Sequence, residues 1–262
     1  MEFFFCYTRY LLIVGGNKIF IKKDNYYKIE EFKNLGIGAI YTTKNLIDSR
    51  IIYKNLVSRN KLKKLFDIED KTIVFASQTH STNIVVIEDK VKKIYPDTDG
   101  FITRNKSLVL FTQYADCLPI YAYDKENEVI GLCHTGWKGA FDGIQKKLIE
   151  KMISEYGSKV ENIIIGLGIG ICVDNYPVGE EFFEDYYRKY GKKMTRLVFS
   201  IRSDGYYYNN IEFNKQILMS IGILEENIVI SNRCTYRDEF HSYRRDGELS
   251  GRNEAFIYFN KK

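Results

Sequence analysis

The chain has 262 residues, of which 45% are hydrophobic and 28% charged, the composition of an ordinary soluble globular protein. Its net charge of +5 comes from scattered Lys and Arg residues without a basic run, which excludes a nucleic-acid partner and fits anionic small substrates. No apolar stretch is long enough to cross a bilayer, so a membrane-spanning protein is also excluded.

The five cysteines are odd in number and widely spaced, and none belongs to a CxxC pair. This pattern excludes a zinc ribbon and a thioredoxin motif, and it favours a reduced, cytoplasmic location. The chain has no linker rich in Pro, Gly or Ser and no internal repeat. We therefore expect a single domain over residues 1–262, and no feature of the sequence indicates an oligomeric state.

Short strand-like runs fill the first half of the chain, each with several apolar or β-branched residues. These runs are KIFIKK (18–23), GAIYTT (38–43), TIVFAS (72–77), NIVVIE (83–88), SLVLFTQ (107–113), LPIYAYD (118–124) and EVIGLCH (128–134). The polar segment YDKENE joins the last two runs, which predicts a hairpin.

Helices are expected mainly in the second half of the chain. Their predicted ranges are 55–66, 138–156, 178–190 and 210–222. In the second helix the apolar residues that recur at steps of three and four are Phe141, Ile144, Leu148, Met152 and Ile153. A strand-rich half followed by helices predicts an α/β fold of the α+β kind, with mixed, largely antiparallel sheets flanked by helices.

Two of the three histidines follow apolar runs: His80 comes after TIVFASQT and His134 after EVIGLC. Cys117 lies between them in QYADCLP. Strand ends that meet at one edge of a sheet bring such residues together, and two imidazoles with one thiolate suit zinc with a fourth position open for catalysis. The separations of 37 and 17 residues form no short-range ligand pattern, so ordinary buried polar residues are the alternative.

The same residues also allow a site without metal. Cys117 would then be a nucleophile activated by His134, with Asp116 or a backbone carbonyl orienting the imidazole ring. Asp116 is also the candidate general acid because it adjoins Cys117, although neighbouring residues on a strand point to opposite faces.

The stretch RCTYRDEFHSYRRDGELSGR (233–252) concentrates arginines that could bind a phosphate or a nucleobase. The candidate substrate-binding residues are Arg233, Arg244 and Arg245. Acidic residues alternate with them, so a solvated loop with ion pairs is the alternative. In IGLGIGIC (165–172), Gly168 is a further candidate, with tight glycine packing as its alternative.

Six motifs follow one another in this chain: SQTHSTNIVVIED, DTDGFIT, LFTQYADCLPIYAYD, GLCHTGWKGAFDGI, IGLGIGIC…YPVGEEF and RCTYRDEFHSYRRDGELSGRNEAFIYF. From about residue 38 onward, the sequence therefore resembles the YfiH-like family of purine nucleoside phosphorylases, formerly described as polyphenol oxidoreductases or laccases. The family's metal-binding and catalytic trio maps onto His80, Cys117 and His134.

The resemblance implies a mononuclear Zn²⁺ site, with Cu²⁺ as the alternative metal, in a layered α/β sandwich related to Cys–His hydrolase folds. It implies purine nucleosides and inorganic phosphate as the small-molecule partners. The implied reactions are phosphorolysis of adenosine, inosine, guanosine and methylthioadenosine, and hydrolytic deamination of adenosine. The alternative is a Cys- or zinc-dependent amide hydrolase that edits a peptidoglycan precursor.

The chain departs from the family pattern at three places. Lys44 is followed by NLIDS where relatives have an Arg-Gly-Gly loop, GLGIGI lacks two prolines, and His241 stands where most relatives have an aromatic residue. We expect His241 to have a local structural role, with a fourth metal ligand or an acid/base group as the alternatives. Three histidines cannot build a trinuclear copper cluster beside a blue-copper site, so only a single-copper oxidoreductase is left of the laccase interpretation.

Overall fold

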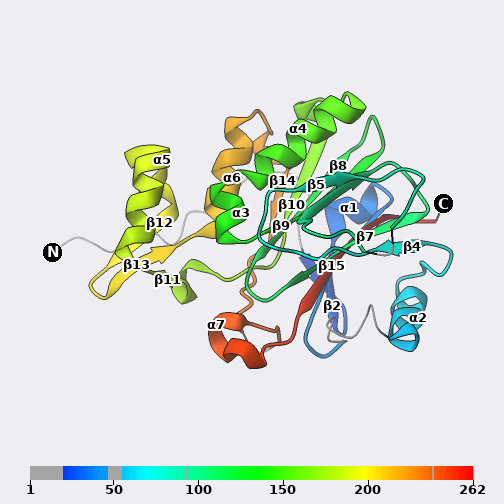
Figure 1. The fold of residues 1–262 in the computed structure, drawn as a ribbon, viewed down its shortest axis with the longest axis horizontal. Helices are drawn as coiled ribbons and strands as arrows, with labels where there is room; N and C mark the ends of the chain where they lie inside the picture. Colours follow the sequence, from blue (N-terminus) through cyan, green and yellow to red (C-terminus); the bar gives the residue numbers. More distant parts are fainter. Residues whose placement is uncertain (1–19, 47–54, 93, 238, 262) are drawn as a thin grey trace.

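The computed structural model describes residues 20–46, 55–92, 94–237 and 239–261 (Figure 1). The first two residues of the predicted strand 18–23 lie outside this part, as does the segment from 47 to 54 that follows Lys44. The described strands form two six-stranded sheets and one three-stranded sheet.

The first sheet places its last strand in chain order between two early ones. Its order is β1 (Phe20–Lys22), β2 (Tyr26–Ile29), β3 (Ile37–Thr42), β15 (Asn253–Phe259), β7 (Leu108–Tyr114) and β4 (Thr72–Val74). All neighbours pair antiparallel except β4 and β7, which are parallel.

The second sheet has the predicted hairpin near its centre. Its order is β14 (Ile228–Ile230), β10 (Ile163–Leu167), β8 (Leu118–Asp124), β9 (Val129–Thr135), β6 (Gly100–Thr103) and β5 (Ile84–Val86). The pairs β10–β14 and β5–β6 are parallel and the others antiparallel. The prediction of mixed, largely antiparallel sheets is confirmed.

The two large sheets pack face to face, with β7 and β15 against β9. Leu110 and Ile257 from the first sheet share a buried core with Tyr121 and Leu132 from the second. Strands covered on both faces need apolar side chains on both, which explains the nearly continuous apolar runs of β7, β8 and β9.

Helices cover the outer faces of this sandwich (Figure 1). Helix α4 (Ile144–Tyr156) buries Leu148 and Met152 against the second sheet, and α2 (Leu56–Leu65) buries Leu62 against the first. The short α1 (Glu30–Asn34) buries Phe32 in the core between the sheets. The fold is thus a mixed α/β sandwich, as predicted.

A smaller unit lies beside the sandwich and supports the turn that follows β9. Its elements are β11 (Pro177–Val178), α5 (Glu180–Val198), β12 (Phe199–Arg202), β13 (Gly205–Tyr208) and α6 (Asn210–Ser220). Tyr186 and Tyr208 are buried in its aromatic core, which also includes Phe141 from α3 (Trp137–Phe141). The remaining helix, α7 (Tyr243–Asp246), precedes β15.

Two predicted helices differ from the observed ones at glycines with positive φ. The helix predicted at 138–156 is two helices, α3 and α4, because Gly143 (φ 88°) interrupts the helical backbone. The helix predicted at 178–190 continues to Val198, with Gly191 (φ 76°) non-helical within it. Among the described residues, no helix is both long and apolar enough to span a membrane.

Candidate active site

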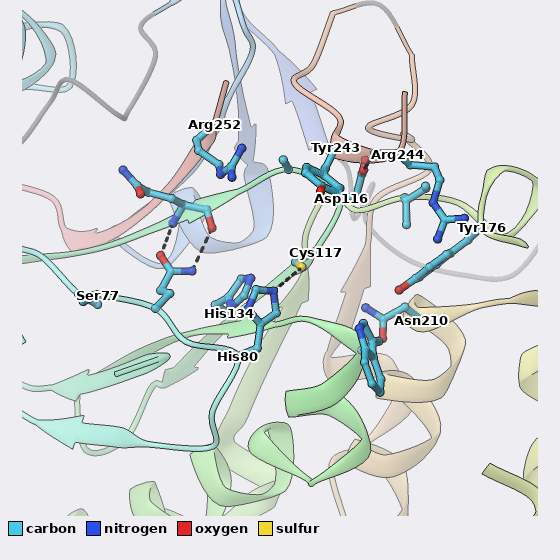
Figure 2. A pocket seen from close by; sticks show the side chains of 16 residues that line it. Ser77, His80, Asp116, Cys117, His134, Tyr176, Asn210, Tyr243, Arg244 and Arg252 are labelled. Atoms are coloured by element: carbon cyan, nitrogen blue, oxygen red, sulfur yellow. Dashed lines mark hydrogen bonds between the residues drawn. The ribbon is translucent and has the colours of Figure 1, made fainter. Parts of the chain in front are cut away.

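Three separate segments bring His80, Cys117 and His134 together (Figure 2). His80 lies in the loop after β4 with a left-handed backbone (φ 60°), Cys117 in the turn between β7 and β8, and His134 near the end of β9. Their ligand-type atoms all lie within 4.8 Å of one another, and Cys117 Sγ is 3.7 Å from His80 Nε2. The structure therefore assembles the trio that the sequence predicts.

The β8–β9 hairpin sets the place of two of these residues. Its antiparallel register pairs Pro119 with His134, so Cys117 at the start of β8 lies beside the end of β9. The residue after that end, Gly136, directly precedes α3 and leaves room for His80 and Cys117. A Cβ atom at Gly136 would lie 2.6 Å from His80 Cδ2 and 3.1 Å from Cys117 Sγ. The glycine of the H-x-GW motif is thus a requirement of the site's geometry.

Asp99 holds both histidines, a role that the sequence reasoning missed. Its buried carboxylate lies 2.8 Å from His134 Nδ1 and accepts hydrogen bonds from the backbone N–H groups of Thr79, His80 and Ser81. With Nδ1 engaged, His134 has Nε2 left for a ligand. The position of Asp99 in DTDGFIT, directly before β6, was the available signal, because β6 pairs with β9.

The buried charges of the site stabilise one another. Burial opposes ionisation of Cys117, but its interactions with His134 and His80 lower the pKa of the thiol to about 6. Burial likewise opposes protonation of His134, but Cys117 and Asp99 raise its pKa to about 9. The interactions of Cys117 and His134 with each other thus favour the charged form of each, a thiolate beside an imidazolium. Cys133, one residue from His134, is buried in the core, and burial raises its pKa to about 12.

A cavity of about 610 Å³ opens onto the trio (Figure 2). Its wall combines aromatic, amide and cationic side chains. The residues that line it besides the trio include Gln78, Gln113, Asp116, Trp137, Tyr176, Asn210, Tyr243, Arg244 and Arg252. This volume lies within the range of small-molecule sites.

The candidate substrate-binding residues do not all reach this cavity. Arg244 lines it. The Arg245 guanidinium instead donates hydrogen bonds to the backbone carbonyls of Tyr236, Arg237 and Phe240, which fixes the loop. Adjacent arginines in one motif therefore have different positions, one at the cavity and one in the loop.

Arg233 and Gly168 also lie away from the residues that line the cavity. The exposed Arg233 guanidinium lies 5.7 Å from the Tyr27 ring centroid. A Cβ atom at Gly168 would collide with the ring of Pro119, so this glycine permits close packing of β10 against β8. The contacts of Gly168 therefore match tight glycine packing, which was the alternative to substrate binding.

Asp116 lines the cavity, yet its carboxylate is engaged with the arginine-rich loop. One oxygen accepts a hydrogen bond from Thr235 Oγ1 at 2.6 Å and the other from the backbone N–H of Arg244 at 2.7 Å. Asp99, and not Asp116, contacts the His134 ring. His241 packs against Gly251 and does not line the cavity.

A disulfide joins Cys172 and Cys234, two cysteines separated by 62 residues. It connects the segment after β10, which carries Ile171 and Tyr176 to the cavity wall, with the loop that carries Arg244. The wide spacing of the cysteines concealed this pairing, because the two segments come together only in the folded protein. There, Gly170 and Cys234 form an isolated backbone β-bridge.

The trio fits a single metal ion. One thiolate and two imidazole nitrogens are ligands that zinc prefers, and the buried Asp99 carboxylate is the usual second partner of a ligand histidine. His and Cys ligands also occur in copper sites. The adjacent cavity leaves an approach for water or substrate, so the arrangement could hold a metal with three protein ligands and one open position.

The sequence profile of the family described as "Multi-copper polyphenol oxidoreductase laccase" matches residues 41–260, most of the chain. The chain belongs to this family. A relative in Borreliella burgdorferi named "Purine nucleoside phosphorylase" is 33% identical over 205 residues, which are 76% of this chain and 87% of the relative. "Adenosine deaminase RL5", from an unknown prokaryotic organism, is 27% identical over 85% of this chain and 94% of its own.

The fold of this chain is also seen in a crystal structure of a similar protein. The hypothetical protein YfiH of Bacillus licheniformis superposes with a TM-score of 0.80 at 28% identity, covering 90% of this chain and 97% of that protein. The resemblance to the YfiH-like family is therefore confirmed, as is the mixed α/β fold.

Proposed function

We propose that this protein is a zinc-dependent purine nucleoside enzyme. Its reactions would be phosphorolysis of adenosine, inosine, guanosine and methylthioadenosine, and hydrolytic deamination of adenosine. The observation that carries the proposal is the trio of His80, Cys117 and His134 in the wall of a cavity of about 610 Å³. The relatives named purine nucleoside phosphorylase and adenosine deaminase support the choice of substrate.

The side chains around the trio have roles that follow from their contacts. Asp99 fixes the ring of His134 and the backbone of the loop that carries His80. Trp137 and Tyr176 offer aromatic faces in the cavity wall on which a purine ring can stack. When bound, a zinc ion supplies Lewis-acid chemistry at the open position.

The two reactions differ in their second substrate. In deamination, water replaces the amino group at C6 of adenine and ammonia leaves. In phosphorolysis, phosphate replaces the base at C1′ of the ribose. Phosphate dependence therefore separates the two reactions in one assay.

The test incubates protein of known metal content with adenosine or inosine, with and without phosphate, and resolves the products by chromatography. We expect inosine from adenosine in both conditions, and hypoxanthine or adenine with ribose 1-phosphate only when phosphate is present. Chelation should abolish both reactions, and Zn²⁺ should restore them better than Cu²⁺. If none of these products forms, the nucleoside assignment is refuted, and peptidoglycan precursors become the next substrates to test.

A further inference from the structure

One arginine of the stretch 233–252 presents its guanidinium to the cavity with donors to spare. Arg244 Nη1 donates to the carbonyl oxygen of Pro177 at 2.9 Å, and the guanidinium lies 5.2 Å from the Tyr176 ring centroid. Its Nε and Nη2 groups have no hydrogen-bond partner among the described residues. The side chain is thus held on one side and open on the other.

The other arginines near the cavity are engaged with the backbone. Arg245 donates to three carbonyl oxygens and pairs with Asp246. Arg252 lines the cavity on the other side of the trio in Figure 2, and its Nη1 donates to the carbonyl oxygens of Ser250 and Gly251. An incoming anion would have to displace these contacts at Arg245, whereas Arg244 can bind it with its remaining donors.

Asp116 fixes the backbone from which Arg244 projects. Its carboxylate accepts the Arg244 N–H and the Thr235 hydroxyl, which joins the two ends of the loop. Asp116 itself has a left-handed backbone (φ 84°) and directly precedes Cys117. The loop that carries Arg244 is therefore tied to the same turn that carries the cysteine of the trio.

We propose that Arg244 is the binding residue for inorganic phosphate and that Asp116 is the residue that positions it. This inference rests on the proposed function. An oxygen of HPO₄²⁻ would form the bond to C1′ while the bond from C1′ to the base breaks. The electron pair leaves with the base, and the proton of the phosphate ends on it. Deamination uses water, so phosphate bound at Arg244 serves only one of the two reactions.

The substitution Arg244→Gln removes the guanidinium and keeps the backbone N–H that donates a hydrogen bond to Asp116. We expect the KM for phosphate to rise at least tenfold and the ratio of phosphorolysis to deamination to fall by a similar factor, because a charged, bidentate contact is lost. Arg233→Gln is the matched control, since it removes the same charge from an exposed side chain that does not line the cavity. Titration calorimetry with phosphate alone should show binding to the wild type and to Arg233→Gln, and weak binding to Arg244→Gln.

Thr235→Val tests the positioning role without changing a residue beside the trio. It removes the hydroxyl that donates a hydrogen bond to Asp116 and conserves the shape of the side chain. We expect a higher KM for phosphate, in the direction of Arg244→Gln, with unchanged metal content and an unchanged KM for the nucleoside. Asp116→Asn should act in the same direction.

The outcomes separate this inference from the proposed function. If nucleosides are turned over and Arg244→Gln leaves the KM for phosphate as it was, the inference is overturned. It is also overturned if Arg252→Gln weakens phosphate binding and Arg244→Gln does not. If no nucleoside reacts but phosphate still binds through Arg244, the subsite stands and the proposed function fails.

Discussion

The carboxylate of Asp99 lies 2.8 Å from Nδ1 of His134 and also accepts the backbone N–H of His80. One buried side chain thus contacts the imidazole of His134, on β9, and the backbone of His80, in the loop after β4. His134 also donates its backbone N–H to the carbonyl of Asp99 at 2.7 Å, so side chain and main chain hold the same pair.

Asp99→Asn conserves the shape of the side chain and removes its charge. We expect metal affinity to fall by about 10- to 100-fold, because the His134 ring loses its anionic partner. Competition with a chromogenic chelator measures the change. Asp124→Asn is the control, since Asp124 is also buried and accepts hydrogen bonds in a turn at the far end of β8. Equal losses of affinity in both variants would refute the role of Asp99.

Gly136→Ala should lower metal occupancy and turnover together, because the new methyl group must displace His80 or Cys117. Gly179→Ala separates this contact from a backbone effect. The two glycines have nearly the same backbone angles (φ −71°, ψ 165° and φ −73°, ψ 163°), and a Cβ at Gly179 meets nothing within 4 Å. Metal analysis of the purified variants is the measurement, and a Gly136→Ala protein with full occupancy would contradict the steric argument.

Cys117 in chelator-treated protein should react with iodoacetamide in proportion to its thiolate fraction. Since its pKa is lowered to about 6, the rate should rise as pH increases through 6 and level off above pH 7. His134→Gln should move the midpoint upward, because the main stabilising charge is lost. Cys133, whose pKa is raised to about 12, should stay unlabelled in the folded protein. A wild-type midpoint near 8.5, the value of a free thiol, would contradict the thiolate–imidazolium pair.

Cys117→Ala should abolish both metal content and turnover, because it removes the thiolate of a three-ligand site. Cys133→Ala, a change in the adjacent core, should retain both. Elemental analysis and the nucleoside assay give the two readouts. Full activity in a metal-free Cys117→Ala protein would remove the site assignment, and loss of activity with metal retained would favour the nucleophile interpretation.

The apolar runs placed the three residues of the trio at or near strand ends, and the resemblance to the YfiH-like family implied that they form one site. It did not identify Asp99, whose contact with His134 spans 35 residues and depends on the pairing of β6 with β9. Nor did it separate Arg244 from Arg245. Neighbouring side chains of one short helix point to different surroundings, and only the tertiary structure decides which one reaches the cavity.

The fold was predictable to a similar degree. The β8–β9 hairpin follows from two apolar runs and a polar turn, and it is observed with the predicted first strand at Leu118–Asp124. The split of the helix at Gly143 was not anticipated, since the apolar spacing continues through the interruption. The pairing of β15 with β3 and β7 was likewise not predicted, because β15 is about 215 residues from β3 and about 145 residues from β7 in the chain.

The central place of β15 has a consequence for biosynthesis. The ribosome makes β3 and β7 long before their common neighbour, so the first sheet has a gap at its centre until residue 259 has emerged. The arginine-rich loop and the strand that follows it are added in the same final step. A nascent chain therefore has the three residues of the trio early, but it cannot complete the sandwich until synthesis has passed β15.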